Sequence, residues 1–180
     1  MTEAARPSYD LLDADQHYYE PHDAFTRYLD PKFRNAFRWV TTEDGRHHIL
    51  MGGRQYSMIP NPTFNPVAKP GALIDYLKAN NAKGASGKEI AGELGPLLPE
   101  YVEREARLKV MDAHGVKSAL VLPTLPLGFE ELLWNDAPAL TALVRAGLKW
   151  LDEDWGFAQD ERLICAPMLC LVDIEAAQQD

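Results

Sequence analysis

The segment from Leu11 to Pro21 holds the residues near the N-terminus that are best suited to chemistry. It reads L-L-D-A-D-Q-H-Y-Y-E-P. Two leucines open it and acidic residues then alternate with others, a pattern typical of a β-strand, in which Asp13, Asp15 and His17 would share one face. Two carboxylates and an imidazole are unfavourable neighbours in an ordinary core, whereas a divalent metal ion takes all three as ligands. The spacing therefore indicates a metal site and leaves open a solvated edge strand.

Other polar residues of this segment have roles that the sequence does not decide. Asp13 would either orient His17 through a hydrogen bond or serve as an interior acid with hydrogen-bonded partners of its own. Gln16 is expected on the opposite face, together with Leu12 and Ala14. Glu20 comes three residues after His17, at the end of the strand, where it would contact metal or substrate, form a salt bridge or cap a loop.

The composition is that of a soluble globular protein with an acidic surface. The chain has 180 residues, 46% of them hydrophobic and 25% charged, and a formal net charge of −9. An acidic chain without a basic cluster is not expected to bind nucleic acid or an anionic membrane. The N-terminal residues lack the apolar core of a signal peptide, so a cytoplasmic location is expected. Cys165 and Cys170, the two cysteines, are expected to be buried free thiols.

Hydrophobic periodicity and turn residues divide the rest of the chain into short elements. Asp44-Gly45 supplies the positive φ of a tight turn and predicts a β-hairpin, while Gly115 and Gly156 are positioned to end helices. The expected elements are a helix over 23–29, a hairpin of strands 37–42 and 47–51, helices over 72–79 and from 86–89, a helix over 101–114, a strand over 119–122, a loop over 125–134, a helix over 136–155, a strand over 163–171 and a helix from Asp173.

The order of these elements predicts an α/β fold with a parallel sheet. Leu11–His17, 119–122 and 163–171 are expected to be neighbouring parallel strands in that order, with 119–122 buried on both faces. Residues 22–100 form one long elaboration after the first strand, within a single domain of residues 1–180. A complete (β/α)₈ barrel needs roughly 250 residues, so the remainder suffices for about the first three βα units of a TIM-type barrel.

Three separated stretches resemble a known family. D-A-D-Q-H-Y-Y-E-P resembles the opening strand of the amidohydrolase superfamily, in particular the amidohydrolase-related branch that includes aminocarboxymuconate-semialdehyde decarboxylase and the resorcylate decarboxylases. The other stretches are P-T-F-N-P-V-A-K-P-G-A-L at 62–73 and W-L-D-E-D-W-G-F at 150–157, followed by A-P-M-L at 166–169. They occur in the same order and span most of the chain, and they belong to the N-terminal part of a longer enzyme.

The resemblance implies that the first strand of the barrel supplies two metal ligands at its carboxyl end. In much of the superfamily both are histidines, whereas here the pair is Asp15 and His17, a substitution found in this branch. The implied cofactor is Zn²⁺ or a similar divalent ion. Further histidines and an aspartate come from later strands, so the catalytic residues are expected beyond Asp180. The substrate would be a small carboxylate-bearing or aromatic molecule, either hydrolysed at a C–N or C–O bond or decarboxylated.

The remaining histidines and several loop residues have structural interpretations that compete with functional ones. His47 and His48 are adjacent and would point apart in a strand, while His22 and His114 carry no ligand spacing. Residues of the insertion and of the loop after the second strand are placed to line a barrel mouth or to serve as packing and surface groups; they are Arg54, Tyr56, Phe129, Trp134 and Asn135.

Sequence motifs of other enzyme classes are missing. Residues 84–88 lack the first glycine and the Ser or Thr of a phosphate-binding loop, and no G-x-S-x-G or G-x-G-x-x-G motif occurs. Two functions stay open. One is a fragment of a metal-dependent hydrolase or lyase, inactive as this chain alone. The other is a truncated, non-catalytic chain that acts through association, because an open parallel sheet leaves strand edges unpaired.

Overall fold

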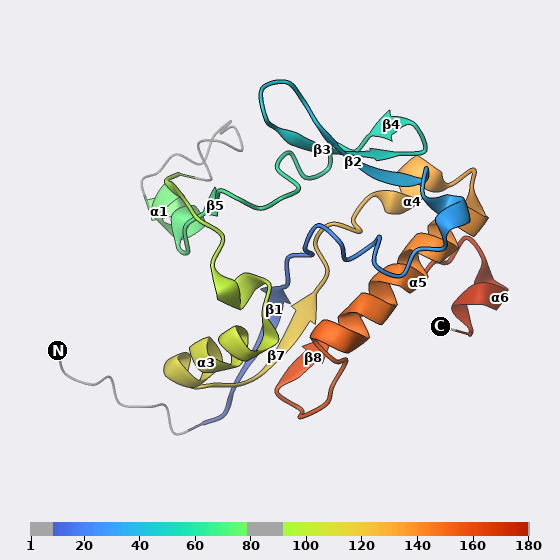
Figure 1. Ribbon diagram of the computed structural model, residues 1–180. Coiled ribbons are helices and arrows are strands. Elements are labelled where there is room, and N and C mark those ends of the chain that lie inside the picture. Colours follow the sequence, from blue (N-terminus) through green and yellow to red (C-terminus); the bar gives the residue numbers. More distant parts are fainter. Residues whose placement is uncertain (1–8, 79–91, 180) are drawn as a thin grey trace. The chain divides into compact units, whose positions relative to one another are not determined.

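A parallel three-stranded sheet forms the centre of the larger of two compact units. The computed structural model describes residues 9–78 and 92–179 (Figure 1). Strands β1 (Leu11–His17), β7 (Val116–Leu122) and β8 (Leu163–Cys165) lie in the order β1-β7-β8 and all run parallel, which confirms the predicted order. Because the strands are parallel, their carboxyl ends meet at one edge of the sheet, and the segments that follow them are brought together there.

The sheet buries one face more completely than the other. On β7, Val116, Ala119 and Val121 are buried, whereas the alternating Leu120 and Leu122 stay half-exposed. The expectation that this strand is buried on both faces is therefore wrong for the described residues. Its continuous apolar run did not distinguish a strand covered on both sides from one covered on a single side.

Helices α3 (Arg104–His114) and α5 (Ala137–Asp154) connect the strands and end as predicted. Gly115 ends α3 with a left-handed backbone, at φ 71°. Asp136 caps α5, since its carboxylate accepts a hydrogen bond from the backbone N–H of Ala139. The beginning of α3 differs from the prediction, because residues 101–103 are not α-helical and a short 3₁₀ helix, η2 (Pro99–Tyr101), precedes it.

Three other predicted elements differ from the structure. Residues 22–28 form consecutive turns rather than a helix, because Asp30-Pro31 stops the chain before a second helical turn can close. The predicted loop 125–134 contains the helix α4 (Phe129–Leu133). The third strand ends at Cys165, not at residue 171, since Pro167 has no N–H to give to a neighbouring strand.

The first part of the insertion packs against the sheet unit. The hairpin of β2 (Phe37–Thr41) and β3 (His47–Met51) is antiparallel, as predicted, and β4 (Arg54–Gln55) extends it. Arg54 donates hydrogen bonds to the carbonyls of Glu131 and Leu132 in α4. Rings of the turn segment, the hairpin and α4 lie 5.0–5.9 Å apart and form a buried aromatic cluster of Phe25, Phe37 and Phe129.

The second part of the insertion is a compact unit of its own, residues 63–98. It contains β5 (Val67–Ala68), α1 (Ala72–Lys78) and β6 (Leu94–Gly95), with β5 and β6 antiparallel and Lys69 2.6 Å from Glu93. The structure thus divides the single predicted elaboration, because residues 22–62 and 99–100 belong to the sheet unit. The predicted helix start at 86–89, and residues 84–88 with their incomplete phosphate-loop pattern, lie outside the described residues.

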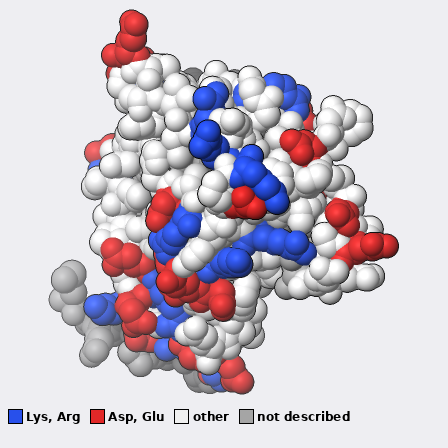
Figure 2. Space-filling model, turned by 45° about the vertical axis from the view of Figure 1, so that its right-hand side comes forward, with Lys and Arg blue, Asp and Glu red and all other residues white. Residues whose placement is uncertain are grey.

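The helix expected from Asp173 and the free cysteines agree with the sequence analysis. The short 3₁₀ helix η1 (Pro31–Phe33) follows the turns, and α6 (Ile174–Ala177) begins at Asp173, whose carboxylate accepts from the N–H of Ala176. Cys165 and Cys170 are buried and free. None of the helices in the described part of the chain is long and apolar enough to cross a membrane. Basic and acidic side chains are interspersed on the face shown in Figure 2.

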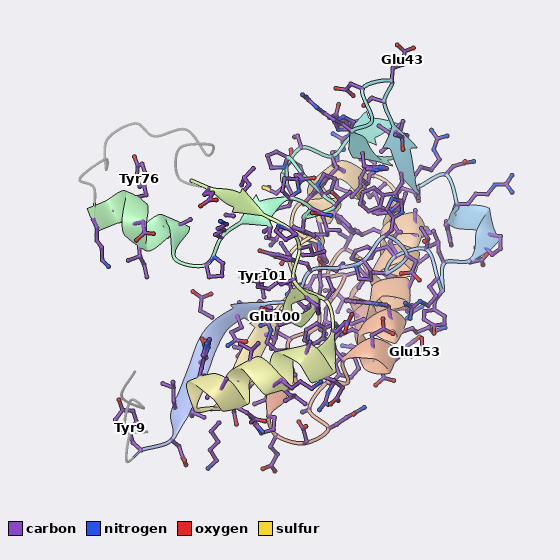
Figure 3. The ribbon with its side chains drawn as sticks, turned by 60° about the vertical axis from the view of Figure 1, so that its left-hand side comes forward. Tyr9, Glu43, Tyr76, Glu100, Tyr101 and Glu153 are labelled. Carbon is purple, nitrogen blue, oxygen red and sulfur yellow. The ribbon has the colours of Figure 1, made fainter. Side chains whose placement is uncertain are left out.

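Arg107 ties α3 to the carboxyl end of β1. Its guanidinium is almost fully buried and donates hydrogen bonds to the carbonyl of Glu100 at 2.6 Å, the side-chain oxygen of Gln16 at 2.6 Å and the carbonyl of His17 at 2.9 Å. Figure 3 labels Glu100 and Tyr101, which lie above α3 in that view. Burial lowers the pKa of Arg107, because desolvation disfavours its charged form. The three acceptors stabilise that charge.

We expect Arg107→Lys to lower the free energy of unfolding by about 2–4 kcal/mol, because an ammonium group does not span three separated acceptors and leaves buried carbonyls unpaired. Urea unfolding followed by circular dichroism measures the change. Lys109→Arg on the exposed side of the same helix is the control and should unfold like the wild type. A loss below about 0.5 kcal/mol for Arg107→Lys would show that the three hydrogen bonds are not needed.

Candidate metal-ligand site at the carboxyl end of the first strand

A bulge interrupts the regular alternation of β1. The strand register with β7 shifts between Asp13 and Gln16, where β1 contains one residue more than its partner. The Asp13 carboxylate accepts hydrogen bonds from the N–H of Asp15 at 3.1 Å and from the Gln16 amide at 2.8 Å. Asp13 and Gln16 therefore contact each other, which corrects the prediction that they lie on opposite faces. A period of two does not hold across an extra residue.

His17 is held at one ring nitrogen by the segment that follows β7. Its Nδ1 lies 3.1 Å from the carbonyl oxygen of Pro123 and 3.2 Å from the hydroxyl oxygen of Thr124. The Thr124 hydroxyl donates its own hydrogen to the carbonyl of Tyr18, at 2.9 Å. Both neighbours of Nδ1 thus act as acceptors, so we assign the proton of the neutral ring to Nδ1 and the lone pair to Nε2.

This arrangement is the one in which histidine binds metal. A metal-ligating histidine usually donates its second ring N–H to a carbonyl or carboxylate, which fixes the ring and leaves the other nitrogen for the metal. The half-buried His17 meets that requirement with Pro123. The hydrogen bond that orients the ring comes from the loop after β7 and not from Asp13, which the sequence offered as one alternative.

Asp15 is the second candidate metal ligand, and the described residues do not provide a third. Its carboxylate is exposed on the same strand, two residues before His17. Within residues 9–78 and 92–179, no three His, Cys, Asp or Glu side chains gather in a way that would hold a metal ion. A catalytic zinc ion needs about three protein ligands. His17 and Asp15 suit part of a zinc site. These two residues alone do not define a step of a metal-dependent reaction.

Glu20 lies in the interior and holds the loop that follows β7. The residue is 3% exposed, and its two carboxylate oxygens accept from the backbone N–H groups of Thr124 at 3.0 Å and Leu125 at 2.9 Å. Of the roles that the sequence left open for Glu20, loop capping is the one that these contacts describe. Desolvation raises the pKa of Glu20 to about 7, although backbone hydrogen bonds, those from Leu125 and Thr124 first, act in the opposite direction.

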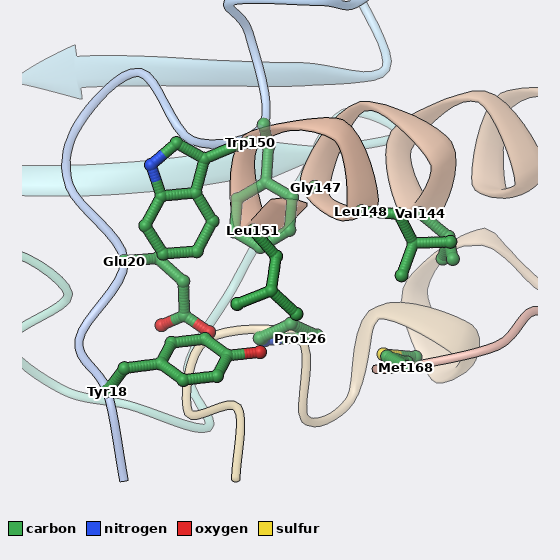
Figure 4. Close-up of a pocket in the computed structure, with 10 residues that line it drawn as sticks. Tyr18, Glu20, Pro126, Val144, Gly147, Leu148, Trp150, Leu151 and Met168 are labelled. Carbon is green, nitrogen blue, oxygen red and sulfur yellow. The ribbon is translucent and has the colours of Figure 1, made fainter. Parts of the chain in front are cut away.

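A small cavity separates Glu20 from helix α5. Its volume is about 20 Å³, enough for one water molecule, and its walls are mostly apolar. Figure 4 shows the Glu20 carboxylate beside the ring of Tyr18, below Trp150 and Leu151 of α5. Burial and the nearby Glu20 raise the pKa of the Tyr18 hydroxyl, so this phenol stays neutral at physiological pH.

The other histidines are not brought to this site by any described contact. His22 stacks on Trp39 with ring centroids 4.0 Å apart, and its ring centroid is 5.8 Å from that of His47. Desolvation, followed by the effect of His47, lowers the pKa of His22. His48 contacts Gln55, and His114 is exposed at the end of α3.

Two of the loop residues identified from the sequence hold segments together in the interior, and two others are exposed. The Tyr56 hydroxyl donates to the loop after β7, lying 3.0 Å from the carbonyl of Leu125 and 2.9 Å from that of Leu127. Phe129 is fully buried in the aromatic cluster, while Trp134 is 64% exposed and Asn135 is also exposed. The sequence analysis overlooked Thr124 and Arg107, whose contacts with His17 join residues 90–107 positions apart.

Comparisons with known proteins found similarity to a solved amidohydrolase. No family model matches the chain, and no curated protein does. The crystal structure of an amidohydrolase from Mycobacterium avium subsp. paratuberculosis superposes with a TM-score of 0.84 and 41% sequence identity over 96% of this chain. The chain spans 45% of the length of that protein. The similarity in sequence and fold supports a relationship to the amidohydrolase superfamily. It does not identify a branch, a metal or a substrate.

The raised pKa of Glu20 predicts a specific pH dependence of stability. The unfolded chain releases this proton near pH 4.5 and the folded chain near pH 7. Between these values the folded state binds more protons, so its free energy of unfolding falls as the pH rises, by about 3 kcal/mol in total. We expect urea unfolding at a series of pH values to show this fall in the wild type and to lack it in Glu20→Gln.

The exposed Glu130→Gln is the control for this experiment, and its stability should follow the wild-type curve. Parallel curves for the wild type and Glu20→Gln between pH 4.5 and 7 would contradict a raised pKa of Glu20 in the folded protein.

Proposed function

We propose that this chain is the metal-binding N-terminal part of a metal-dependent amidohydrolase-like hydrolase, with His17 and Asp15 as its metal ligands. The observation that carries the proposal is the state of His17. The hydrogen bonds of Nδ1 leave Nε2 as the basic nitrogen at the carboxyl end of β1. The 41% identity to an amidohydrolase over nearly the whole chain supports the choice of enzyme class.

Imidazole and carboxylate are ligands that suit Zn²⁺, which we propose as the metal. When bound, such an ion polarises a carbonyl group or lowers the pKa of a water molecule. In this proposal Nε2 of His17 and the carboxylate of Asp15 would hold the metal, and Arg107 fixes the backbone at His17. The remaining ligands and the general base are proposed to come from residues outside this sequence.

The wider proposal follows the family resemblance. The parallel order β1-β7-β8 suits the opening of a (β/α)₈ TIM-type barrel, in which carboxyl ends of strands carry the site. The branch that includes aminocarboxymuconate-semialdehyde decarboxylase is proposed from the stretches around His17, at 62–73, and at 150–157 with 166–169. A small carboxylate-bearing or aromatic substrate is proposed on the same ground, with decarboxylation as the alternative reaction.

A second candidate function is association without catalysis. Apolar side chains of the sheet and of the segment after β8 are strongly exposed, among them Leu12 at 66%, Ile164 at 45% and Leu171 at 62%. Exposed apolar groups favour self-association. Under this alternative the chain would form oligomers and show no preference for metal at His17.

We expect Co²⁺, used as a probe for Zn²⁺, to broaden the side-chain NMR signals of His17 before those of the other histidines. Binding should be weak and hydrolysis absent for this chain alone, because two ligands leave most of the coordination to water. Asp15→Asn should weaken binding about tenfold or more, since even the loss of a residue that orients a ligand has an effect of about 10–100-fold.

His114→Ala removes an exposed histidine and is the control, which should bind Co²⁺ like the wild type. Broadening that starts at His22 and His47, or that is equal at all histidines, would contradict the proposed ligands. Tight stoichiometric metal together with turnover by the monomeric chain would show that this chain alone holds a complete site.

A further inference from the structure

The buried carboxylate of Glu20 faces the protein interior and not the ligand site. Its two oxygens are both occupied by backbone N–H groups of the loop after β7, and the residue is 3% exposed. The groups that this buried carboxylate binds are those of the loop after β7. It can act on the chemistry of His17 through the residues that it holds.

Thr124 connects Glu20 to His17. Its backbone N–H binds Glu20 at 3.0 Å, and its hydroxyl oxygen lies 3.2 Å from Nδ1 of His17. The same hydroxyl donates to the carbonyl of Tyr18 at 2.9 Å. Thr124 is thereby fixed at its backbone by Glu20 and at its hydroxyl by Tyr18, the residue after β1, with its hydroxyl oxygen next to the imidazole.

The preceding residue of the same loop completes the arrangement. The Pro123 carbonyl is the second acceptor near Nδ1, at 3.1 Å, and it belongs to the peptide bond whose N–H, on Thr124, binds Glu20. The Glu20 carboxylate therefore polarises and orients the very peptide group whose oxygen accepts the proton of His17. Hydrogen bonds in such a chain strengthen one another.

We propose that Glu20 is a positioning residue that sets the tautomer of His17 through the Pro123–Thr124 peptide group. The carboxylate holds this peptide so that two acceptors face Nδ1, which keeps the proton there and the lone pair on Nε2. The inference about metal binding rests on the proposed function, whereas the inference about the tautomer does not. A buried carboxylate that acted only as a structural support would leave the proton position of His17 unchanged.

The geometry predicts what happens when the carboxylate is lost. Glu20→Gln keeps the size of the side chain but replaces one acceptor oxygen by an NH₂ donor, which cannot bind a backbone N–H. One of the N–H groups of Thr124 and Leu125 is then unpaired, and the loop must shift to find another acceptor. The acceptors near Nδ1 shift with it, so His17 should populate both neutral tautomers.

Thr124 provides an independent pair of variants. Thr124→Val removes the hydroxyl at nearly constant volume, whereas Thr124→Ser retains it. If the hydroxyl helps to hold the proton at Nδ1, the valine variant should lose the single tautomer and the serine variant should keep it. These variants keep the proposal testable even where Glu20→Gln folds poorly, because they leave the buried carboxylate and its two N–H partners in place.

The test is ¹⁵N NMR of the histidine rings in the full 180-residue chain without metal, at a pH where His17 is neutral, followed by a Co²⁺ titration. We expect one tautomer, protonated at Nδ1, in the wild type and in Thr124→Ser, and a mixture in Glu20→Gln and Thr124→Val. Each of the two latter variants should weaken Co²⁺ binding at His17 about tenfold. The double variant should be little weaker than either alone, because both changes act on one path.

Val144→Ala is the matched control, since Val144 lines the same cavity as Glu20 and its truncation loosens packing without removing a hydrogen bond of the loop after β7. This variant should keep the wild-type tautomer. An unchanged tautomer in Glu20→Gln, or additive losses in the double variant, would overturn the proposal. A wild type with the expected tautomer but without Co²⁺ binding at His17 would contradict the proposed function and leave the positioning role of Glu20 standing.

Discussion

The three hydrogen bonds of the Arg107 guanidinium define the carboxyl end of the first strand. They connect a helix, the 3₁₀ segment before it and the strand that carries the candidate ligands. A charge buried in this way is stable only when acceptors surround it, so movement of the backbone at His17 removes one of the three acceptors of the guanidinium. The position of the candidate site thus depends on an ionic group that is not itself part of the chemistry.

Glu20 provides the opposite charge on the other side of the same strand end. It binds two consecutive N–H groups of the loop after β7, while Arg107 binds carbonyl oxygens of β1 and of the segment before α3. Two buried ions with separate sets of backbone partners hold β1 and the β7 loop in one geometry. Each carries an electrostatic penalty, visible in the raised pKa of Glu20 and the lowered pKa of Arg107.

The similarity to a solved amidohydrolase and the geometry at His17 are two independent observations that both support the proposed function. The superposition covers the fold of nearly the whole chain, and it says nothing about protons or ligands. The hydrogen bonds of His17 describe a ring prepared for a ligand role, and they do not identify an enzyme class. Function depends on the site more than on the fold, so the metal ligands remain the decisive point.

Local patterns in the sequence predicted the bounds of β1 and the parallel strand order. They also predicted the hairpin turn at Asp44-Gly45 and the helix caps Asp136 and Gly115, because neighbouring residues and burial periodicity determine these features. The tertiary structure alone decided the contacts of the candidate site. The bulge that brings Asp13 to Gln16 depends on the register with β7, and the partners of His17 and Glu20 lie more than 100 residues away. A strand pattern can identify His17 as a candidate ligand, but the orientation of its ring is set by hydrogen-bond acceptors from segments that are distant in the sequence.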